Sequence, residues 1–390
     1  MIAATFDLAA AARRRWDVAV LGAGPAGSLA ARQLAVAGAG VLLVDRKAFP
    51  RDKVCGACLN GKALAVLDAV GLGGLVDRLG GIDLDAFELR LAGRRQRFAL
   101  PAGKALGRDW LDAALIEEAI AAGAHFLPET SARIEVGEEE TRAVRLTQHG
   151  HAATTEAAVV LVASGLAGHC LDDEPGVRTR IAARSRIGAG CTLREFPASY
   201  GPGTIHMAVG RHGYVGLVRV ADGGLNVAAA FDVGFVREQG SPARAAVAVL
   251  DEAGFDPISA LDEARWQGTP SLTRRTRPVG GHRLFLLGDA AGYVEPFTGE
   301  GMAAAFTSAQ AVVPLALRGA RDWEPGLARA WSRLHHRLIG RRQHICRGLA
   351  ATARHPWVAR GLFAVVSYAP SLSRRMIQRL NAPPPHFEAT

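Results

Sequence analysis

The sequence predicts an α/β protein with a parallel sheet, a second, antiparallel sheet and a helical C-terminus. The first observation is a short apolar run, residues 16–21, which leads into a glycine-rich turn and then a helical segment. The second is a change of apolar spacing to two between residues 181 and 232, which is typical of antiparallel strands. The third is the run RLFLLG, residues 283–288, which restores a buried strand. Because the chain leaves the first sheet and returns to it, the first domain is predicted to be discontinuous.

The glycine-rich turn (GAGPAG, residues 22–27) has the spacing of a Rossmann-type dinucleotide site. The first glycine permits a tight turn, the second lets the backbone approach a pyrophosphate, and the third lets helix and strand pack closely. A proline suits the first helical turn, whose free amides and dipole favour a diphosphate. The next apolar strand ends in an aspartate that can accept hydrogen bonds from an adenosine ribose. This context favours a dinucleotide site over a glycine-rich turn in another doubly wound sheet. The predicted contacts are Gly22, Gly24, Pro25, Ala26, Gly27 and Asp45.

Composition narrows the class of protein. The 390 residues suffice for two domains, and 49% hydrophobic with 21% charged residues is typical of globular proteins. The 46 basic and 37 acidic residues give a net charge of +9, which favours an acidic ligand or an anionic surface. Nucleic acid is not expected, because aromatic and basic residues are not interleaved. The five cysteines lack a paired framework and the 12 histidines lack a metal-binding spacing, so we expect a cytoplasmic protein without a metal.

The segments between these motifs are assigned in chain order. Residues 1–15 are predicted to be a loose terminus, and residues 46–59 a loop. Helical spacing over residues 60–70 and 108–123 predicts two helices, the second capped by Asp109 and stopped by Gly123. Alternation predicts a hairpin that turns at Ala92-Gly93. Further strands are predicted over residues 124–136, 141–148 and 157–164.

These assignments predict three regions. The dinucleotide-binding domain comprises residues 14–82, 101–180 and 276–328, and the antiparallel substrate domain comprises residues 83–100 and 181–275. Residues 329–390 form a helical and basic C-terminal region. A basic amphipathic helix can lie on an anionic membrane surface, and it can equally pack over a substrate cavity, so both roles stay open.

A second motif follows the restored strand. It reads GDAAGYVEPFTGEGM over residues 288–302, and its last glycines open a helix. Together with the glycine turn and Arg108, it resembles flavoproteins of the p-hydroxybenzoate hydroxylase type. Within that group the sequence looks most like the geranylgeranyl reductase and flavin-halogenase branch, whose flavin-side loop is similar to residues 49–56 (FPRDKVCG). The resemblance covers roughly residues 16–330 and implies a bound FAD.

The resemblance implies a role for each motif residue. Asp289 would hold ribityl hydroxyls, Arg108 would lie on the diphosphate side, and the helix opened by Gly299 would aim its N–H groups at the flavin N1/O2 edge. This branch commonly has Asp-Gly where the chain has Ser164-Gly165, which puts fine tuning of the site and its coupling to NAD(P)H in question. The FAD contacts implied in this way are Arg46, Lys53, Cys55, Gly56, Arg108, Gly288, Asp289, Pro296, Gly299, Gly301 and Met302.

Three residues are candidates for catalysis: Cys55, Tyr214 and Glu295. Cys55 would line the cavity beside the flavin, although with Cys58 it also forms a CxxC that a redox pair or a zinc site could use. Tyr214 would lie over the substrate side of the flavin, where Gly216 replaces a bulky residue and leaves room; otherwise it is an ordinary half-buried strand tyrosine.

The roles of Glu295 and of two histidines also stay open. Glu295 could accept a proton or simply cap a turn. His206 and His212 bracket the substrate sheet as structural residues or as acid–base groups.

The predicted function is that of an FAD-dependent oxidoreductase. The first candidate is a monooxygenase that hydroxylates a lipophilic or aromatic secondary metabolite. The second is a geranylgeranyl reductase-like enzyme that reduces a C=C bond of a prenyl or lipid substrate. An alternative of another class is a non-catalytic flavoprotein partner. Since the sequence has no second GxGxxG domain, NAD(P)H would visit transiently as reductant, or an electron-carrier protein would supply the electrons.

Overall fold

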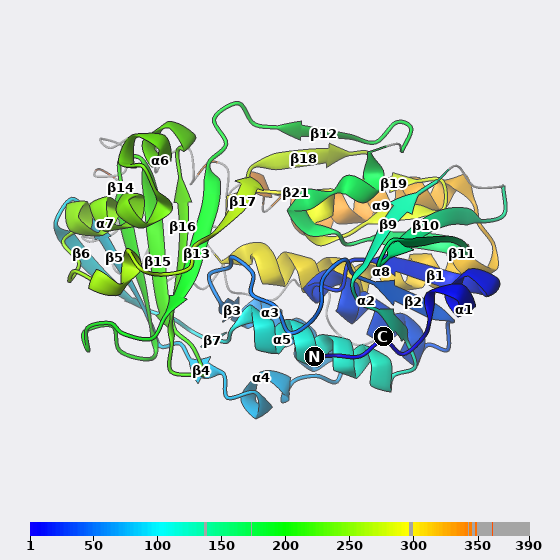
Figure 1. The fold of residues 1–390 in the computed structure, drawn as a ribbon, viewed down its shortest axis with the longest axis horizontal. Coiled ribbons are helices and arrows are strands. Elements are labelled where there is room, and N and C mark those ends of the chain that lie inside the picture. Colours follow the sequence, from blue (N-terminus) through cyan, green and yellow to red (C-terminus); the bar gives the residue numbers. More distant parts are fainter. Residues whose placement is uncertain are drawn as a thin grey trace.

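The computed structural model describes residues 1–135, 139–172, 174–295 and 299–341, together with residues 343, 344, 348 and 361. Figure 1 shows two large sheets, one in each lobe of the molecule, with the long helices α2, α5 and α8 gathered against one of them. Parallel pairing dominates the first sheet and antiparallel pairing the second. The predicted fold class is therefore confirmed.

The first sheet is parallel from β20 to β8 and forms the dinucleotide-binding side of the fold. β1 lies at its centre, between β11 and β2, and β20 pairs with β11 although it comes more than 100 residues later. This late strand brings the chain back to the first sheet, as the sequence predicts. In order, the strands are β19 (Gly280–Gly281), β20 (Leu284–Leu286), β11 (His151–Val162), β1 (Arg15–Leu21), β2 (Val41–Val44) and β8 (His125–Leu127), with β10 (Arg142–Gln148) and β9 (Thr130–Ile134) extending antiparallel from β11.

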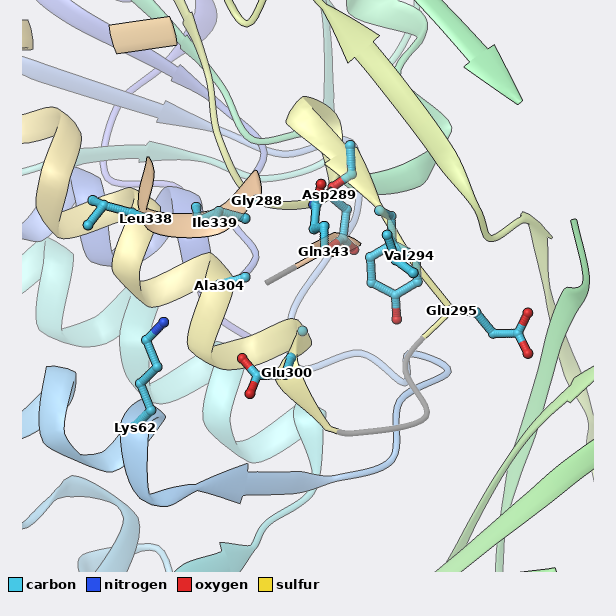
Figure 2. A pocket seen from close by; sticks show the side chains of 13 residues that line it. Lys62, Gly288, Asp289, Val294, Glu295, Glu300, Ala304, Leu338, Ile339 and Gln343 are labelled. Carbon is cyan, nitrogen blue, oxygen red and sulfur yellow. Dashed lines mark hydrogen bonds between the residues drawn. The ribbon is translucent and has the colours of Figure 1, made fainter. Parts of the chain in front are cut away.

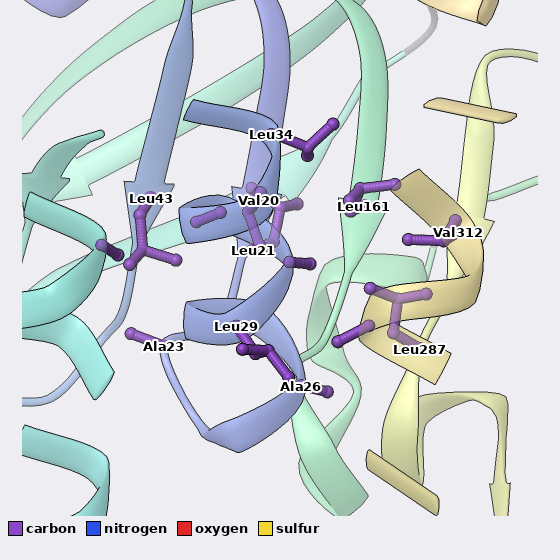
Figure 3. Close-up of a cluster of buried hydrophobic side chains, with 14 of the residues drawn as sticks. Val20, Leu21, Ala23, Ala26, Leu29, Leu34, Leu43, Leu161, Leu287 and Val312 are labelled. Atoms are coloured by element: carbon purple, nitrogen blue, oxygen red, sulfur yellow. The ribbon is translucent and has the colours of Figure 1, made fainter. Parts of the chain in front are cut away.

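Apolar side chains from this sheet and its helices form the main core. Figure 3 shows Ala26 and Leu29 of α2 (Pro25–Val36) near Leu287 and Val312, the latter from α8 (Glu300–Arg321). All four side chains are buried. Two helices that begin at the two glycine motifs are therefore anchored in one core, which fixes the motifs relative to each other.

The second sheet has seven strands. β5 and β6 enter it from the early part of the chain, and β5 pairs with β14 in parallel while its other neighbours are antiparallel. Helix α7 packs against β14 and β15 through a buried alanine- and valine-rich face. In order, the strands are β17 (Gln267–Ser271), β13 (Ile187–Leu193), β16 (Leu225–Phe231), β15 (Gly213–Arg219), β14 (Thr204–Gly210), β5 (Ala86–Leu91) and β6 (Arg94–Ala99).

Two three-stranded sheets complete the strand content of the described residues. The first is β12 (Arg178–Ile181), β18 (Arg274–Arg277) and β21 (Gly292–Tyr293), and Figure 1 shows β12 and β18 running along one outer edge of the molecule. The second is β3 (Cys58–Asn60), β7 (Gly103–Ala105) and β4 (Ile82–Asp83). The exact domain boundaries given above stay a prediction.

The remaining helices are short, apart from α5. They are α1 (Leu8–Arg13), α3 (Gly61–Ala69), α4 (Leu75–Arg78), α5 (Arg108–Ala121), α6 (Val233–Gln239), α7 (Pro242–Ala253), α9 (Pro325–His335), the 3₁₀ turns η1 (Gly165–Ala167), η2 (His169–Leu171), η3 (Ser259–Leu261) and η4 (Gly288–Ala291), and the π-helix η5 (His336–Gly340). None of the described helices combines the length and hydropathy that crossing a membrane requires. The predicted membrane contact falls on residues 329–390, and most of residues 342–390 lie outside the described part of the chain.

The N-terminal segment corrects one expectation. Residues 1–15 are not a loose terminus, because Asp7 caps α1 by accepting a hydrogen bond from the Ala10 N–H at 2.6 Å. The fully buried Ala11 accepts hydrogen bonds at its carbonyl from Trp16 Nε1 (3.1 Å) and Thr155 Oγ1 (2.7 Å). The helix was not predicted because it is too short for its apolar residues to show a clear helical period.

Candidate FAD site

The glycine turn after β1 has the close packing that only glycine allows. Gly22 has φ +110°, and a Cβ there would lie 2.4 Å from the carbonyl oxygen of Ala163. A Cβ on Gly27 would lie 1.8 Å from the carbonyl oxygen of Gly22. Gly24 is the N-cap residue of α2, and Pro25 occupies its first turn. The turn therefore presents backbone N–H groups at a helix N-terminus, which suits a diphosphate.

Asp45 lies directly after β2 and braces this turn. Its Oδ2 accepts a hydrogen bond from the Ala23 N–H at 2.8 Å, and its Oδ1 accepts one from the Lys47 N–H at 2.9 Å. The side chain is 9% exposed. Each carboxylate oxygen keeps a further lone pair, so the residue can also accept from a ribose hydroxyl. The neighbouring Arg46 is exposed.

Arg108 places a fixed positive charge beside the glycine turn. Its Nε and Nη2 donate to the two carboxylate oxygens of Asp112, each at 2.8 Å, and Asp112 is fully buried. A Cβ on Gly24 would lie 3.8 Å from Arg108 Nη2. Arg51 approaches the same carboxylate at 4.0 Å and that of Asp45 at 3.9 Å. The bidentate pair holds the guanidinium in place, as a diphosphate contact requires.

The loop after Asp45 carries Lys53 and Cys55 to the second sheet. The carbonyl of Cys55 accepts a hydrogen bond from Asn226 Nδ2 at 2.9 Å, so β16 holds this loop. A Cβ on Gly165 would lie 3.2 Å from Lys53 Nζ, so this ammonium lies against the Ser164-Gly165 turn. Burial lowers the pKa of Lys53, and the charge of Arg108 adds to this, whereas Asp289 opposes it. The side chain of Lys53 thus lies at the turn for which the resemblance implies an aspartate.

The second motif meets the first in space. Gly288 has φ +53°, and a Cβ there would lie 3.1 Å from the Cβ of Ala26. Gly288 begins η4, whose Asp289 faces Lys53, Arg108 and Arg274. Burial raises the pKa of the Asp289 carboxyl, while the charges of these three residues lower it. The carboxylate therefore lies within a cluster of cations at the junction of both motifs.

Helix α8 begins beside the same cluster. Gly299 caps it with φ +68°, and a Cβ on Gly301 would lie 3.7 Å from the Tyr293 ring. Met302, in the first turn, is buried. Figure 2 shows Asp289 and Glu300 around a pocket that continues toward η5. Its lining is Lys62, Gly288, Asp289, Gly292, Tyr293, Val294, Glu295, Glu300, Gly301, Ala304, Leu338, Ile339 and Gln343. Pro296, which was predicted to contact FAD, lies outside the described residues.

Tyr214 shares an apolar cluster with Tyr293. Burial raises the pKa of Tyr293 well above its usual range, and the nearby Asp289, Cys55 and Tyr214 add to the effect. Tyr214 is 5% exposed and belongs to a buried cluster with Met207 and Leu166, against which Tyr293 packs. Two of the three catalytic candidates, Tyr214 and Cys55, therefore lie near this tyrosine. The space expected at Gly216 is largely filled, since a Cβ there would lie 3.3 Å from Met207 Cε.

Glu295, the third candidate, points away from Asp289 and Glu300 toward the second sheet (Figure 2). Its Oε1 accepts from Arg186 Nη1 at 2.8 Å, and each of the two side chains is 1% exposed. Arg186 also lies 3.2 Å from Asp232 through Nε, and its guanidinium is 5.8 Å from the Tyr214 ring. Sequence reasoning missed Arg186, because the arginine-rich run before β13 gives no sign of which side chain turns inward.

The other candidates take structural positions. His206 is buried against Tyr200 and Phe255, in a core cluster separate from that of Tyr214, and burial lowers its pKa. His212 stacks on Phe235 at 5.0 Å and lies 3.7 Å from Asp232. Burial and Cys55 raise the pKa of the Cys58 thiol, and both cysteines are free thiols. No cluster of metal-ligating side chains occurs among the residues that the structure describes.

These residues fit FAD. The glycine cradle and Arg108 suit its diphosphate, Asp45 its adenosine ribose, Asp289 its ribityl chain, and the N-terminus of α8 its flavin. Gly56, the last of the predicted contacts, is exposed in the loop that carries Cys55. The fold and the site thus define a flavoprotein of the FAD-dependent oxidoreductase class.

Comparison with known proteins supports this class. Residues 15–316 match the family described as an FAD binding domain, and the chain belongs to that family. A curated relative is the menaquinone reductase of Mycobacterium tuberculosis (strain CDC 1551 / Oshkosh), which is 56% identical over 57 residues. That match covers 15% of this chain and only 14% of the relative's length.

Two solved structures share the fold. CmlS, a flavin-dependent halogenase, has a TM-score of 0.71 at 22% identity, over 83% of this chain and 62% of that chain. A geranylgeranyl bacteriochlorophyll reductase-like protein from Thermoplasma acidophilum has a TM-score of 0.73 at 18% identity, over 87% and 88% of the two chains. The predicted relationship to the geranylgeranyl reductase and halogenase branch is therefore confirmed at the level of fold.

Proposed function

We propose that the chain is a monooxygenase that hydroxylates a lipophilic or aromatic small molecule. The observation that carries this proposal is the apolar cluster beside the candidate flavin site, where Tyr214, Met207 and Leu166 are buried and Tyr293 packs against them. An apolar, aromatic wall favours a substrate of the same character. Tyr293 follows Asp289 by four residues, so the wall adjoins the residue assigned to the ribityl chain.

The side chains would bind and orient, and the cofactor would supply the redox chemistry. When bound, FAD would supply the electron transfer of the reaction. In the overall reaction a substrate C–H group, dioxygen, NAD(P)H and one proton give the hydroxylated product, water and NAD(P)⁺. Arg108 and Asp289 would hold the cofactor, while Tyr214 and Cys55 would contact the substrate. The buried ion pair with Arg186 favours a structural role for Glu295 over proton transfer.

A second candidate is reduction of a C=C bond in a prenyl or lipid substrate. The short match to a menaquinone reductase favours it, because that relative's name refers to a lipophilic quinone. In this reaction NAD(P)H and one proton would reduce the double bond, and no dioxygen would be used. A non-catalytic flavoprotein is the alternative of another class.

The reductant and the location belong to the proposal as well. NAD(P)H would reach the flavin transiently, or an electron-carrier protein would replace it. We propose a cytoplasmic protein whose basic C-terminal region, within residues 329–390, can touch a membrane surface.

The test uses the purified full chain. Bound FAD is read from the visible spectrum, and oxidation of NADH and of NADPH is followed together with dioxygen consumption. Substrate-dependent use of one dioxygen per NAD(P)H, with a hydroxylated product and no hydrogen peroxide, supports hydroxylation. Oxidation of NAD(P)H by an alkene or a quinone without dioxygen contradicts it in favour of reduction. A chain that binds FAD but oxidises neither nucleotide with any acceptor contradicts both enzymatic candidates.

A further inference from the structure

The ribbon of β12 and β18 carries four arginines on one face. Arg178 is directly opposite Arg277, and Arg180 is directly opposite Arg275. Since alternate residues of a strand point to the same face, all four side chains share a face of the ribbon. The residues of the other face include Thr179 and Thr276, whose hydroxyl groups lie 3.0 Å apart. The four-arginine face is defined by Arg178, Arg180, Arg275 and Arg277.

This arrangement is unfavourable without an external anion. Like charges directly opposite each other in a sheet destabilise it. Within the part of the chain that the structure describes, these four side chains make no ion pair with a carboxylate. All four residues of β12 are exposed, and β12 is an edge strand. The positive charge is therefore concentrated at the surface, where a negatively charged partner can neutralise it.

The ribbon also presents an apolar side chain. Ile181, the last residue of β12, is 55% exposed and is one of the few large hydrophobic side chains that reach solvent among the described residues. Figure 1 shows β12 along the outer edge of the molecule, where a flat partner can approach it. By the same alternation Ile181 lies on the other face of the ribbon, so the four arginines alone would meet the phosphates of a bilayer.

The opposite side of the ribbon leads to the candidate flavin site. Arg274 donates to the carbonyl of Ser271 at 2.7 Å, and its charge acts on Asp289. β18 also pairs with β21, which follows η4. A partner on the ribbon would therefore lie close to the site that binds the cofactor.

We propose that the four-arginine face of β12 and β18 docks the protein on an anionic lipid bilayer. The charge of the face and the net charge of +9 both favour this partner over a neutral one. The proposal holds for either candidate reaction. It assigns the contact to a described ribbon, distinct from the basic C-terminal region.

Vesicle sedimentation of the full chain tests the proposal. Vesicles of phosphatidylcholine with added phosphatidylglycerol are compared with vesicles of phosphatidylcholine alone. The double variant Arg178→Gln/Arg180→Gln should bind the anionic vesicles roughly 30-fold more weakly, since each arginine near such a surface contributes about 1 kcal/mol. The matched control Arg94→Gln/Arg97→Gln removes the same charge from exposed positions of β6 and should bind like the unaltered chain. Ile181→Ser changes the other face of the ribbon and should bind the anionic vesicles like the unaltered chain.

Three results would overturn the proposal. The first is equal binding to both kinds of vesicle. The second is equal loss in the ribbon variant and the β6 control, which would show a general charge effect. The third is unchanged vesicle binding in the ribbon variant. If that variant keeps its vesicle binding but loses affinity for NADPH or for an acidic carrier protein, the four-arginine face binds that partner and not a bilayer. Thermal unfolding by circular dichroism establishes that each variant is folded.

Discussion

Arg186 and Glu295 come from different parts of the chain and meet at 2.8 Å in the interior, where each side chain is 1% exposed. Arg186 directly precedes β13, and Glu295 follows β21. Their ion pair therefore ties the second sheet to the loop that leads into α8.

Removing one member of this pair should destabilise the protein strongly. Arg186→Leu removes the guanidinium that lies 2.8 Å from the buried Glu295 carboxylate, and Glu295→Leu leaves the buried Arg186 with the partly exposed Asp232 at 3.2 Å. Breaking a buried pair in this way costs up to about 3–5 kcal/mol of the free energy of unfolding. The double variant should lose less than the sum, because it leaves neither charge behind. Urea unfolding measures all three. The exposed pair Arg318–Glu324, at 2.7 Å, is the matched control, and its single variants should change the free energy by less than about 1 kcal/mol. Equal losses at both pairs would contradict the interpretation.

Gly27→Ala should abolish FAD binding and destabilise the first sheet. The added Cβ would lie 1.8 Å from the carbonyl oxygen of Gly22, so the turn must open. Gly234→Ala in α6 is the control, since a Cβ there meets no atom within 4 Å. Flavin absorbance per protein after gel filtration measures retention. A Gly27→Ala protein that keeps its flavin would show that the turn is not part of the site.

Asp289→Ala should weaken FAD binding roughly 10- to 100-fold, the equivalent of about 1.5–3 kcal/mol for a hydrogen bond to a charged group. The substitution removes the acceptor predicted for the ribityl chain and leaves Lys53, Arg108 and Arg274 without their shared counter-charge. Fluorescence titration of the apoprotein with FAD gives the affinity. Asp262→Ala, at an exposed turn, should bind FAD like the unaltered chain. Equal affinities for the two variants would remove Asp289 from the site.

Acidification should destabilise the fold through His335. Burial, reinforced by His336, lowers the pKa of this histidine to about 4. In the unfolded chain a histidine titrates near 6.5, so the unfolded state binds more protons between these two values. The contribution of the neutral His335 to the free energy of unfolding is therefore complete above about pH 6.5. As the pH falls toward 4, the free energy of unfolding decreases by up to roughly 3 kcal/mol.

Urea unfolding of the His335→Phe variant at pH 7 and pH 5 checks this effect. The variant should lose less stability on acidification than the unaltered chain. The control His151→Gln changes an exposed histidine of β11 and should leave the pH dependence as it is. If His335→Phe keeps the full pH dependence, another group causes it.

Local patterns predicted most of the fold. Residues 108–123 were expected to be helical and α5 spans Arg108–Ala121, and the predicted hairpin turns at Ala92-Gly93, where both residues have positive φ. These features follow from spacing, capping and turn residues that are close together in the sequence. The glycine motif was predictable for the same reason.

Contacts between distant segments were not predictable. Lys53 lies at the Ser164-Gly165 turn, more than 100 residues later in the chain, and this contact leaves no local pattern in the sequence. The resemblance predicted which motifs would bind FAD but not which of several arginines would be buried. Arg186 is one of five arginines between residues 178 and 194, and only the fold distinguishes it.

The contact between Ala26 and Gly288 determines when the protein can capture its cofactor. The glycine turn that contains Ala26 is translated early. Gly288 emerges from the ribosome only after most of the chain has been made. A nascent chain that ends before Leu287 possesses the diphosphate turn without the surface that closes over it. We therefore expect flavin loading to be a late event in biosynthesis, and we expect a chain split within the intervening region to bind flavin only after its two halves reassemble.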